Sequence, residues 1–301
     1  MADRRAAVAP AGALVFNALV WGVSWWPFRE LQANGLHPLW STAAVFLFST
    51  VCLLLVAPSA WRAFGRTPLL WLLAAACGLT NIGFNWGVTI GDVVRVVLLF
   101  YLMPAWSILL AWPLLGERPT PLRLARLVLA LAGVVIVLQP EGGAGWPVPR
   151  STPDFLALLG GASFALTNIL LRKLREVPST SRALAMFGGG MGVAALAATA
   201  GTLVGTVPGL PAPAASWLWL ALGLAVAFLA SNMALQFGAA RLAAHTTALV
   251  MLSEVVFASL SSVALGAAQL TPRTLVGGAL ILAAAAWAAW PVGERASAGA
   301  Q

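Results

Sequence analysis

Long apolar runs separated by short polar breaks make up nearly the whole chain. A helix that crosses a membrane needs about 20 mostly apolar residues, because each residue adds about 1.5 Å to its length. Ten runs meet this requirement, and the pattern predicts a helix in each of them. The predicted helices span residues 11–29, 38–57, 68–90, 93–115, 121–139, 153–171, 182–205, 214–237, 243–265 and 272–290.

Thr-Pro pairs stand where several of these helices are predicted to start. A threonine side chain can accept a hydrogen bond from the free N–H groups of the first turn, and proline suits the first helical position because it has no N–H. The pairs therefore predict four helix starts more sharply than hydropathy does. They are Thr67-Pro68, Thr120-Pro121, Thr152-Pro153 and Thr271-Pro272.

The stretch Leu102–Leu138 is repeated, about 150 residues later, in Leu252–Trp287. Each copy has two apolar runs around a short break, and Leu115-Gly116 in the first break matches Leu265-Gly266 in the second. A repeat of this length indicates two related halves, each of five helices. An odd number of helices per half places the second half in the opposite orientation.

The charges in the two breaks support opposite orientations. The first break carries Glu117, Arg118, Arg123 and Arg126, whereas the second carries only Arg273. Short loops rich in Lys and Arg stay on the cytoplasmic side of a membrane. The sequence therefore predicts an inverted repeat, an arrangement typical of transporters.

Ten helices place both termini on one side of the membrane, which the basic residues identify as the cytoplasmic side. Only Arg29, Arg95, Arg150 and Arg273 then fall on the external side. The predicted organisation is a cytoplasmic N-terminus at 1–10, a first repeat at 11–139, an external linker at 140–152, a second repeat at 153–290 and a cytoplasmic tail at 291–301.

Composition agrees with a membrane protein. Of 301 residues, 60% are hydrophobic and 9% are charged, whereas a soluble domain has about 25% charged residues. The formal charge of +8 is scattered between apolar runs, which disfavours nucleic-acid binding. The sequence has no catalytic or cofactor motif, and both cysteines lie inside apolar runs. We therefore predict an all-α integral membrane protein that is not an enzyme and holds no cofactor or metal.

Polar residues recur at helical spacing inside the apolar runs. Asn81 and Asn85 are four residues apart, and so are Asn232 and Gln236 at the matching positions of the second half. Such residues usually face other helices or a wet cavity, because a polar group in hydrocarbon is costly. Two interpretations stay open: hydrogen bonds between helices, or a shared polar surface that binds substrate near the bilayer midplane.

Glu254 and Pro104 are the most unusual of these residues. Glu254 lies about eleven residues into its helix, ~16 Å along its axis and near the bilayer centre. It can act as a proton-coupling group, as the counter-charge of a substrate ammonium, or as a structural hydrogen-bonding group. Pro104 removes a backbone hydrogen bond and predicts a kink, either in a cavity wall or at a packing contact. Asp92 and Arg95 are predicted to form a surface ion pair or an external gate.

The candidate cavity residues are those that carry polar or aromatic groups on the inward stripes. They are Trp21, Ser24, Asn81, Asn85, Trp86, Tyr101, Trp106, Asn168, Asn232, Gln236, Ser253 and Glu254, with Pro104 at the kink.

The chain resembles the drug/metabolite transporter superfamily, in its ten-helix EamA-type branch, over about residues 11–290. The resemblance is carried by Trp21-Gly22, Pro104, Leu115-Gly116-Glu117, Thr120-Pro121, Ser253-Glu254, Leu265-Gly266 and Leu270-Thr271-Pro272. Two positions depart from the pattern. Val255 replaces a proline that commonly follows the ninth-helix glutamate, and Ala267 replaces an expected glutamate.

The resemblance implies a transporter of the bacterial inner membrane that exports small metabolites by alternating access. Within the superfamily, the chain resembles YddG-like exporters of aromatic amino acids. We therefore expect a neutral or aromatic amino acid as substrate, with a proton as a possible coupling ion. A multidrug or polyamine exporter and a non-transporting membrane scaffold are the alternatives.

Overall fold

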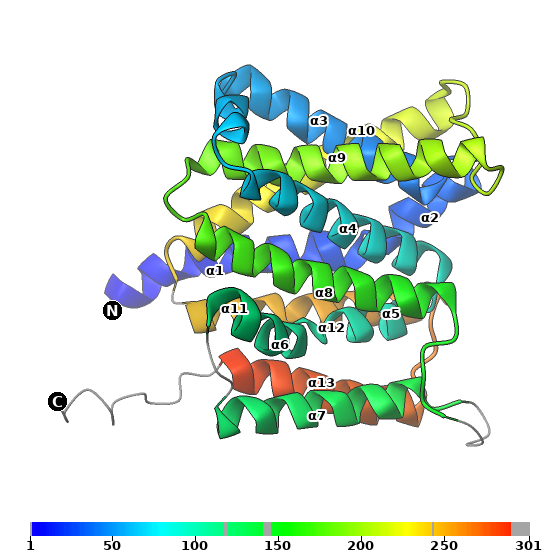
Figure 1. Ribbon diagram of the computed structural model, residues 1–301. Coiled ribbons are helices and arrows are strands. Elements are labelled where there is room, and N and C mark those ends of the chain that lie inside the picture. Colours follow the sequence, from blue (N-terminus) through cyan, green and yellow to red (C-terminus); the bar gives the residue numbers. More distant parts are fainter. Residues whose placement is uncertain (1, 117–119, 141–145, 243, 290–301) are drawn as a thin grey trace.

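The computed structural model describes residues 2–116, 120–140, 146–242 and 244–289, and this part of the chain is helical without a strand. Figure 1 shows the helices stacked side by side along one common direction. They are α1 (Ala2–Val23), α2 (Trp25–Ala33), α3 (Pro38–Val56), the 3-10 helix η1 (Ala60–Gly65), α4 (Leu69–Ile90), α5 (Val93–Phe100), α6 (Met103–Leu115), α7 (Pro121–Leu138), α8 (Thr152–Lys173), α9 (Ser179–Leu203), α10 (Ala215–Ala239), α11 (Ala244–Met251), α12 (Ser253–Ala264) and α13 (Pro272–Ala289).

The predicted helical membrane fold is confirmed. Within the described residues, nine helical segments have the length and apolar composition to cross a membrane, and Pro272–Ala288 is a shorter apolar helix. Each of them coincides with one predicted span. The first segment is longer than predicted, because α1 already begins at Ala2 and α2 continues to Ala33.

Three of the predicted spans are divided into two helices. The first divides at Ser24, the fourth at Tyr101 and Leu102, and the ninth at Leu252. Pro104 explains the fourth break, because it cannot supply the N–H that the carbonyl of Phe100 would accept in a continuous helix. The breaks at Ser24 and Leu252 were not predicted.

A serine side chain accompanies each of these other breaks. The Ser24 hydroxyl donates to the carbonyl of Trp21 at 2.7 Å, and the Ser253 hydroxyl donates to the carbonyl of Val250 at 2.6 Å. Such back-bonding offers the carbonyl a partner other than the helix ladder and often bends a helix. The ninth span thus breaks although Val255 stands where a proline was expected.

Two of the four Thr-Pro pairs cap helices as predicted. The Thr120 hydroxyl accepts from the backbone N–H of Arg123, and the Thr271 hydroxyl accepts from that of Thr274. The prediction for Thr152 was wrong, because the cap of α8 is Ser151, which forms a reciprocal capping box with Asp154. At α4 the N-cap is Pro68, and the Thr67 side chain caps nothing.

Chain order and spatial order differ in this bundle (Figure 1). α1 packs between α10 and α12, while α4 packs against α8 and α9. α7 and α13 pack against each other and lie at the bottom of the view. α1 begins and α13 ends at the same end of the molecule, on the left of Figure 1.

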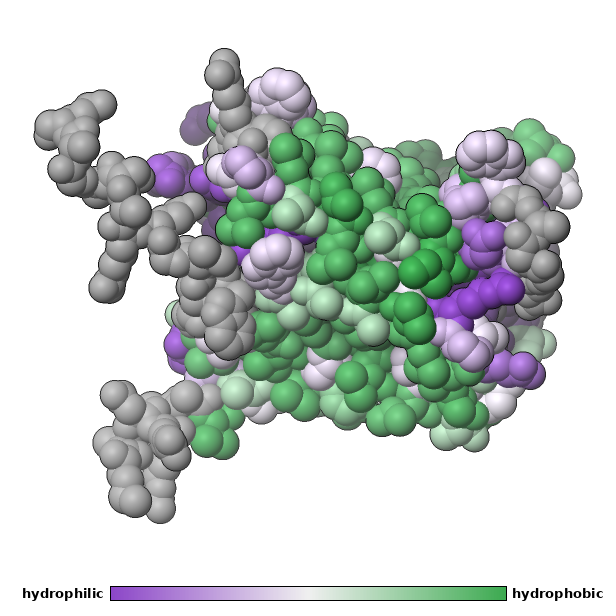
Figure 2. All heavy atoms as spheres, turned by 90° about the horizontal axis from the view of Figure 1, so that it is seen from below, coloured by the Kyte–Doolittle hydropathy of each residue, from purple (hydrophilic) through white to green (hydrophobic). Residues whose placement is uncertain are grey.

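The outer face of α7 and α13 is apolar. Val128 and Val135 on α7 and Leu275 and Val276 on α13 are all about half exposed. Figure 2 shows this face from below, with hydrophobic side chains across its middle and hydrophilic ones gathered towards its ends. A broad apolar band between polar ends is the surface expected of a protein surrounded by lipid.

Candidate transport cavity

A cavity of about 840 Å³ lies inside the bundle, bounded by residues from twelve of the described helices. Arg172 at the end of α8, Ala239 at the end of α10 and Ala288 near the end of α13 line it and are exposed. These three helix ends lie at the end of the molecule where α1 begins (Figure 1). The cavity is therefore open to solvent at that end.

Four aromatic rings that contact one another line one part of the cavity, the aromatic floor. Trp21 and Phe84 meet edge to face with their ring centroids 5.7 Å apart, and Phe84 meets Phe100 in the same way at 5.0 Å. Phe100 in turn contacts Phe164 at 5.7 Å, and all four rings line the cavity. A continuous aromatic floor offers ring edges and faces to an apolar or aromatic part of a ligand.

The two helix breaks of the fourth and ninth spans meet in the wall of this cavity. Tyr101, at the first break, places its hydroxyl oxygen 3.0 Å from the carbonyl oxygen of Met251 and 3.1 Å from a carboxylate oxygen of Glu254. Both of these partners flank the second break at Leu252. Tyr101 and Glu254 are buried, and both line the cavity.

The Tyr101 hydroxyl has one proton and two acceptors within reach. With Glu254 ionised, the hydroxyl can donate to the carboxylate. With Glu254 protonated, the carboxyl group can donate to the tyrosine oxygen while the hydroxyl turns to the carbonyl of Met251. The same geometry therefore provides hydrogen-bond partners for both the ionised and the protonated carboxyl group of Glu254.

Gly22 positions Glu254 by letting α1 approach the backbone of α12. A Cβ atom at Gly22 would lie 2.7 Å from the carbonyl oxygen of Glu254 and 2.8 Å from the Cβ atom of Phe257. Only glycine fits a contact this close. The Trp21-Gly22 pair thus has two roles in the structure: Trp21 contributes to the cavity floor, and Gly22 sets the distance between α1 and α12.

Of the thirteen predicted residues, seven line the cavity and six do not. The seven in the lining are Trp21, Asn81, Tyr101, Pro104, Asn168, Asn232 and Glu254. The six outside it are Ser24, Asn85, Trp86, Trp106, Gln236 and Ser253.

Three of the six residues outside the lining bond to the protein itself. Ser24 and Ser253 bond to carbonyls at the helix breaks. Asn85 is fully buried, and its amide donates to the hydroxyl of Thr42 on α3 at 3.2 Å. Asn85 therefore joins two helices.

The other three lie elsewhere in the bundle. Trp86 meets the His37 ring edge to face at 5.2 Å between centroids. Trp106 packs from α6 against the buried apolar cluster around Phe100, and its indole N–H is buried without a hydrogen-bond partner. Gln236 is exposed on α10.

Several lining residues were not among the predicted site residues. Asn17 lines the cavity and donates to the hydroxyl of Ser231 at 2.6 Å, which joins α1 to α10. Arg123, Arg126 and Arg172 line the open end. Their charges were interpreted only as topology signals of short loops, because the sequence does not show that they face inwards. Among the described lining residues, these arginines and Glu254 are the charged ones.

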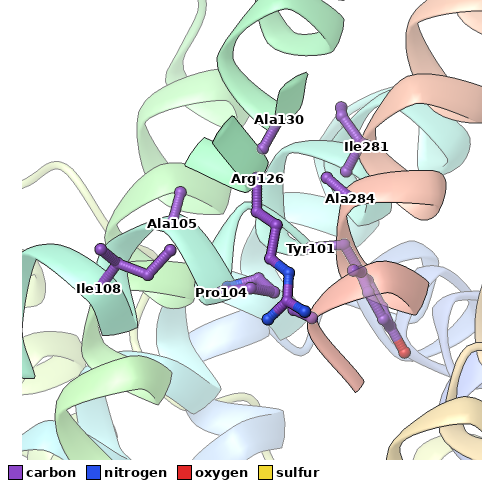
Figure 3. Close-up of a pocket in the computed structure, with 10 residues that line it drawn as sticks. Tyr101, Pro104, Ala105, Ile108, Arg126, Ala130, Ile281 and Ala284 are labelled. Carbon is purple, nitrogen blue, oxygen red and sulfur yellow. The ribbon is translucent and has the colours of Figure 1, made fainter. Parts of the chain in front are cut away.

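A second, much smaller space of about 10 Å³ adjoins the cavity wall between α6, α7 and α13. Figure 3 shows Arg126 extending from α7 towards Pro104, with Ile281 and Ala284 of α13 beside it and the Tyr101 hydroxyl pointing away. Arg126 and Tyr101 line both spaces.

The end of the bundle opposite the cavity opening is held closed by arginines. Arg95 of α5 pairs with Asp154 of α8 through two hydrogen bonds of 2.7 Å and 3.0 Å, and also donates to the carbonyl of Val137 at the end of α7. Arg29 donates to the carbonyl of Gly91, and Arg273 to that of Pro140. The predicted Asp92–Arg95 ion pair was wrong, because Asp92 instead caps α5 by accepting from the backbone N–H of Arg95.

The described residues contain no group of three His, Cys, Asp or Glu side chains placed to hold a metal ion. The lining groups that the structure describes offer instead hydrogen bonding, one carboxylate, three guanidinium groups and ring surfaces. This set can bind a small organic molecule.

Comparison with known proteins gives likenesses of two kinds, to a protein family and to solved structures. Residues 10–139 match the EamA-like transporter family. The match runs from Pro10 in α1 to the residue after α7. A solved structure described as "Crystal structure of protein" is 23% identical, with a TM-score of 0.55, and the match covers 92% of this chain and 96% of that one. It shares the fold of this chain. No curated protein matches the sequence.

Proposed function

We propose, from the likeness of residues 10–139 to EamA-like transporters, that this chain is a secondary transporter of small organic solutes. The observation that carries the proposal is the 840 Å³ cavity, open at one end of the bundle and closed at the other by the Arg95–Asp154 pair. A cavity with one opening is one state of an alternating-access cycle. In the other state, the opening closes and the opposite end parts.

The two halves of the sequence supply matching elements for such a cycle. The breaks at Leu102 and Leu252 are 150 residues apart, as are Gly116 and Gly266, which both have left-handed backbone angles, with φ of 73° and 68°. These correspondences support the proposed inverted repeat of residues 11–139 and 153–290. Substrate would bind between the halves, near the two breaks.

The proposed substrate is a neutral amino acid, with aromatic ones favoured, and the proposed direction is export from a bacterial cytoplasm. The floor formed by Trp21, Phe84 and Phe100 suits an apolar side chain, and stacking on it contributes about 0.5–1.5 kcal/mol beyond area burial. Glu254 suits the ammonium group or a coupling proton. Among the described lining residues, three arginines stand against one glutamate, and this excess of positive charge disfavours a polyamine or a cationic drug.

Counterflow in proteoliposomes tests the proposal. We expect uptake of labelled phenylalanine that excess unlabelled tryptophan blocks and a quaternary ammonium dye does not. Glu254→Gln should lower this flux at least tenfold at unchanged protein yield, whereas Glu176→Gln, which alters an exposed carboxylate outside the cavity, should not. Block by the dye alone would reject the amino-acid assignment. Absence of flux for all solutes would favour a scaffold.

A further inference from the structure

Arg126 is a partly buried cation in the cavity wall that the proposed chemistry at Glu254 does not use. It lies five residues after the start of α7, about 8 Å along the helix axis. Its side chain lines the cavity, and its Nε atom is buried without a hydrogen-bond partner. A buried N–H without a partner is costly, and more so when it carries charge.

The one ring contact of Arg126 leaves its hydrogen-bond donors available. Its guanidinium carbon lies 5.5 Å from the centroid of the Trp287 ring. A cation over an aromatic ring is held through the ring face, whereas the five N–H groups of a guanidinium point outwards in its own plane. Trp287 therefore holds the group in place without occupying the donors that could form a paired contact with an anion.

The neighbouring charges favour an anion at this position. Arg123, three residues earlier on α7, and Arg172 at the end of α8 line the same cavity. Glu254, the one carboxylate among the described lining residues, lies instead beside Tyr101, whose hydroxyl points away from Arg126 in Figure 3. Positive charge is thus gathered at the open end of the cavity, and negative charge is placed at the helix breaks.

We propose that Arg126 binds the carboxylate group of the transported solute, so that the cavity selects organic monocarboxylates, amino acids included, over amines. The planar fork of a guanidinium matches the two oxygens of a carboxylate. A carboxylate paired with the terminal N–H groups of this fork lies where solute enters from the open end. This inference deepens the proposed transport function and rests on it, but its test does not require transport.

The test measures, by calorimetry, the binding of two probes to the purified protein in detergent. The probes are 3-phenylpropionate, which has the ring and a carboxylate, and phenethylamine, which has the ring and an ammonium group. Wild-type protein should bind 3-phenylpropionate. Arg126→Gln should weaken that binding by about tenfold or more and leave phenethylamine binding unchanged. Arg241→Gln is the matched control, because Arg241 also stacks on an aromatic ring, Phe237, but lies outside the cavity lining.

A second measurement uses unaltered protein. Phenylglyoxal modifies accessible arginines, and peptide mass spectrometry reports which ones. 3-Phenylpropionate should protect Arg126 and leave the exposed Arg175 reactive, whereas phenethylamine should protect neither. Failure of 3-phenylpropionate to bind, or to protect Arg126, would overturn the proposal.

The two proposals fail in different ways. If 3-phenylpropionate binding depends on Arg126 but the protein shows no amino-acid flux, the carboxylate site is retained and the amino-acid substrate is rejected. If the flux depends on Glu254, and Arg126→Gln changes neither the flux nor 3-phenylpropionate binding, the transporter is retained and the carboxylate site is rejected.

Discussion

The Arg95–Asp154 pair is predicted to hold one end of the bundle closed. The coupling energy between the two side chains can be estimated from the structure. The Asp154 side chain is 2% exposed and receives two hydrogen bonds from Arg95, the shorter of 2.7 Å. It also accepts from the backbone N–H of Arg150 at 3.2 Å. Removing one member of a buried pair costs about 3–5 kcal/mol. Because the Arg95 side chain is 32% exposed, solvent screens part of this interaction, and we expect a coupling energy of about 2 kcal/mol.

A double-mutant cycle measures that coupling. Unfolding free energies are measured in mixed micelles for wild type, Arg95→Gln, Asp154→Asn and the double variant. Subtracting the losses of stability in the two single variants from the loss in the double variant gives the coupling energy of the pair. The control is Arg175→Gln, because Arg175 pairs with Glu176 at 3.1 Å but both side chains are mostly exposed. That control should leave unfolding unchanged. A coupling below about 0.5 kcal/mol would refute the reasoning that this pair holds the closed end.

Further predictions concern helix packing, a helix cap and topology. Gly133→Ala should destabilise the protein by about 1–3 kcal/mol in thermal or micellar unfolding, because the new Cβ would lie 2.6 Å from the carbonyl oxygen of Gly277, whereas Gly192→Ala, with open space around it, should not. Burial lowers the pKa of His37, whose Nδ1 accepts from the backbone N–H of Leu39 as the N-cap of α3. The unfolded chain then binds this proton more readily, so stability should fall as the pH drops from about 7 to 5, and His37→Asn, which caps without titrating, should flatten that dependence. Labelling at the loop residues Arg118 and Gly143 would test the topology, but both lie outside the described residues, so the exposed residues Trp146 and Arg175 are used instead. In a variant lacking Cys52 and Cys77, an impermeant thiol reagent should label Trp146→Cys but not Arg175→Cys in intact cells, and the reverse would contradict a cytoplasmic N-terminus.

The ten helical spans could be predicted because they depend on local properties of the chain. Apolar length sets each span, and Thr120 and Thr271 cap the helices that follow them. The break beside Pro104 was also predictable, since proline lacks the N–H that a continuous helix needs. The breaks at Ser24 and Leu252 were not, because a serine in a helix bonds back to a carbonyl only in some contexts.

The cavity residues were harder to predict than the helices, because helical spacing fixes only an approximate face. Residues four apart are rotated by about 40° from each other around the axis. That rotation is enough to place Asn81 in the cavity lining and Asn85 against Thr42 of α3. The direction of Arg126 depends on the position of α13, which supplies Trp287. No local pattern around residue 126 contains that information.

The difference between the two halves at their matching breaks bears on mechanism. Tyr101 at the first break contributes a hydroxyl, whereas the second break contributes the carboxylate of Glu254 and the carbonyl of Met251. If the halves rock against each other, this contact is stretched in every cycle, because its donor and its acceptors belong to different halves. A change in the protonation of Glu254 then alters the bond that joins the halves directly. In the proposed transport cycle, this pair would therefore link the protonation of Glu254 to the contact between the two proposed halves.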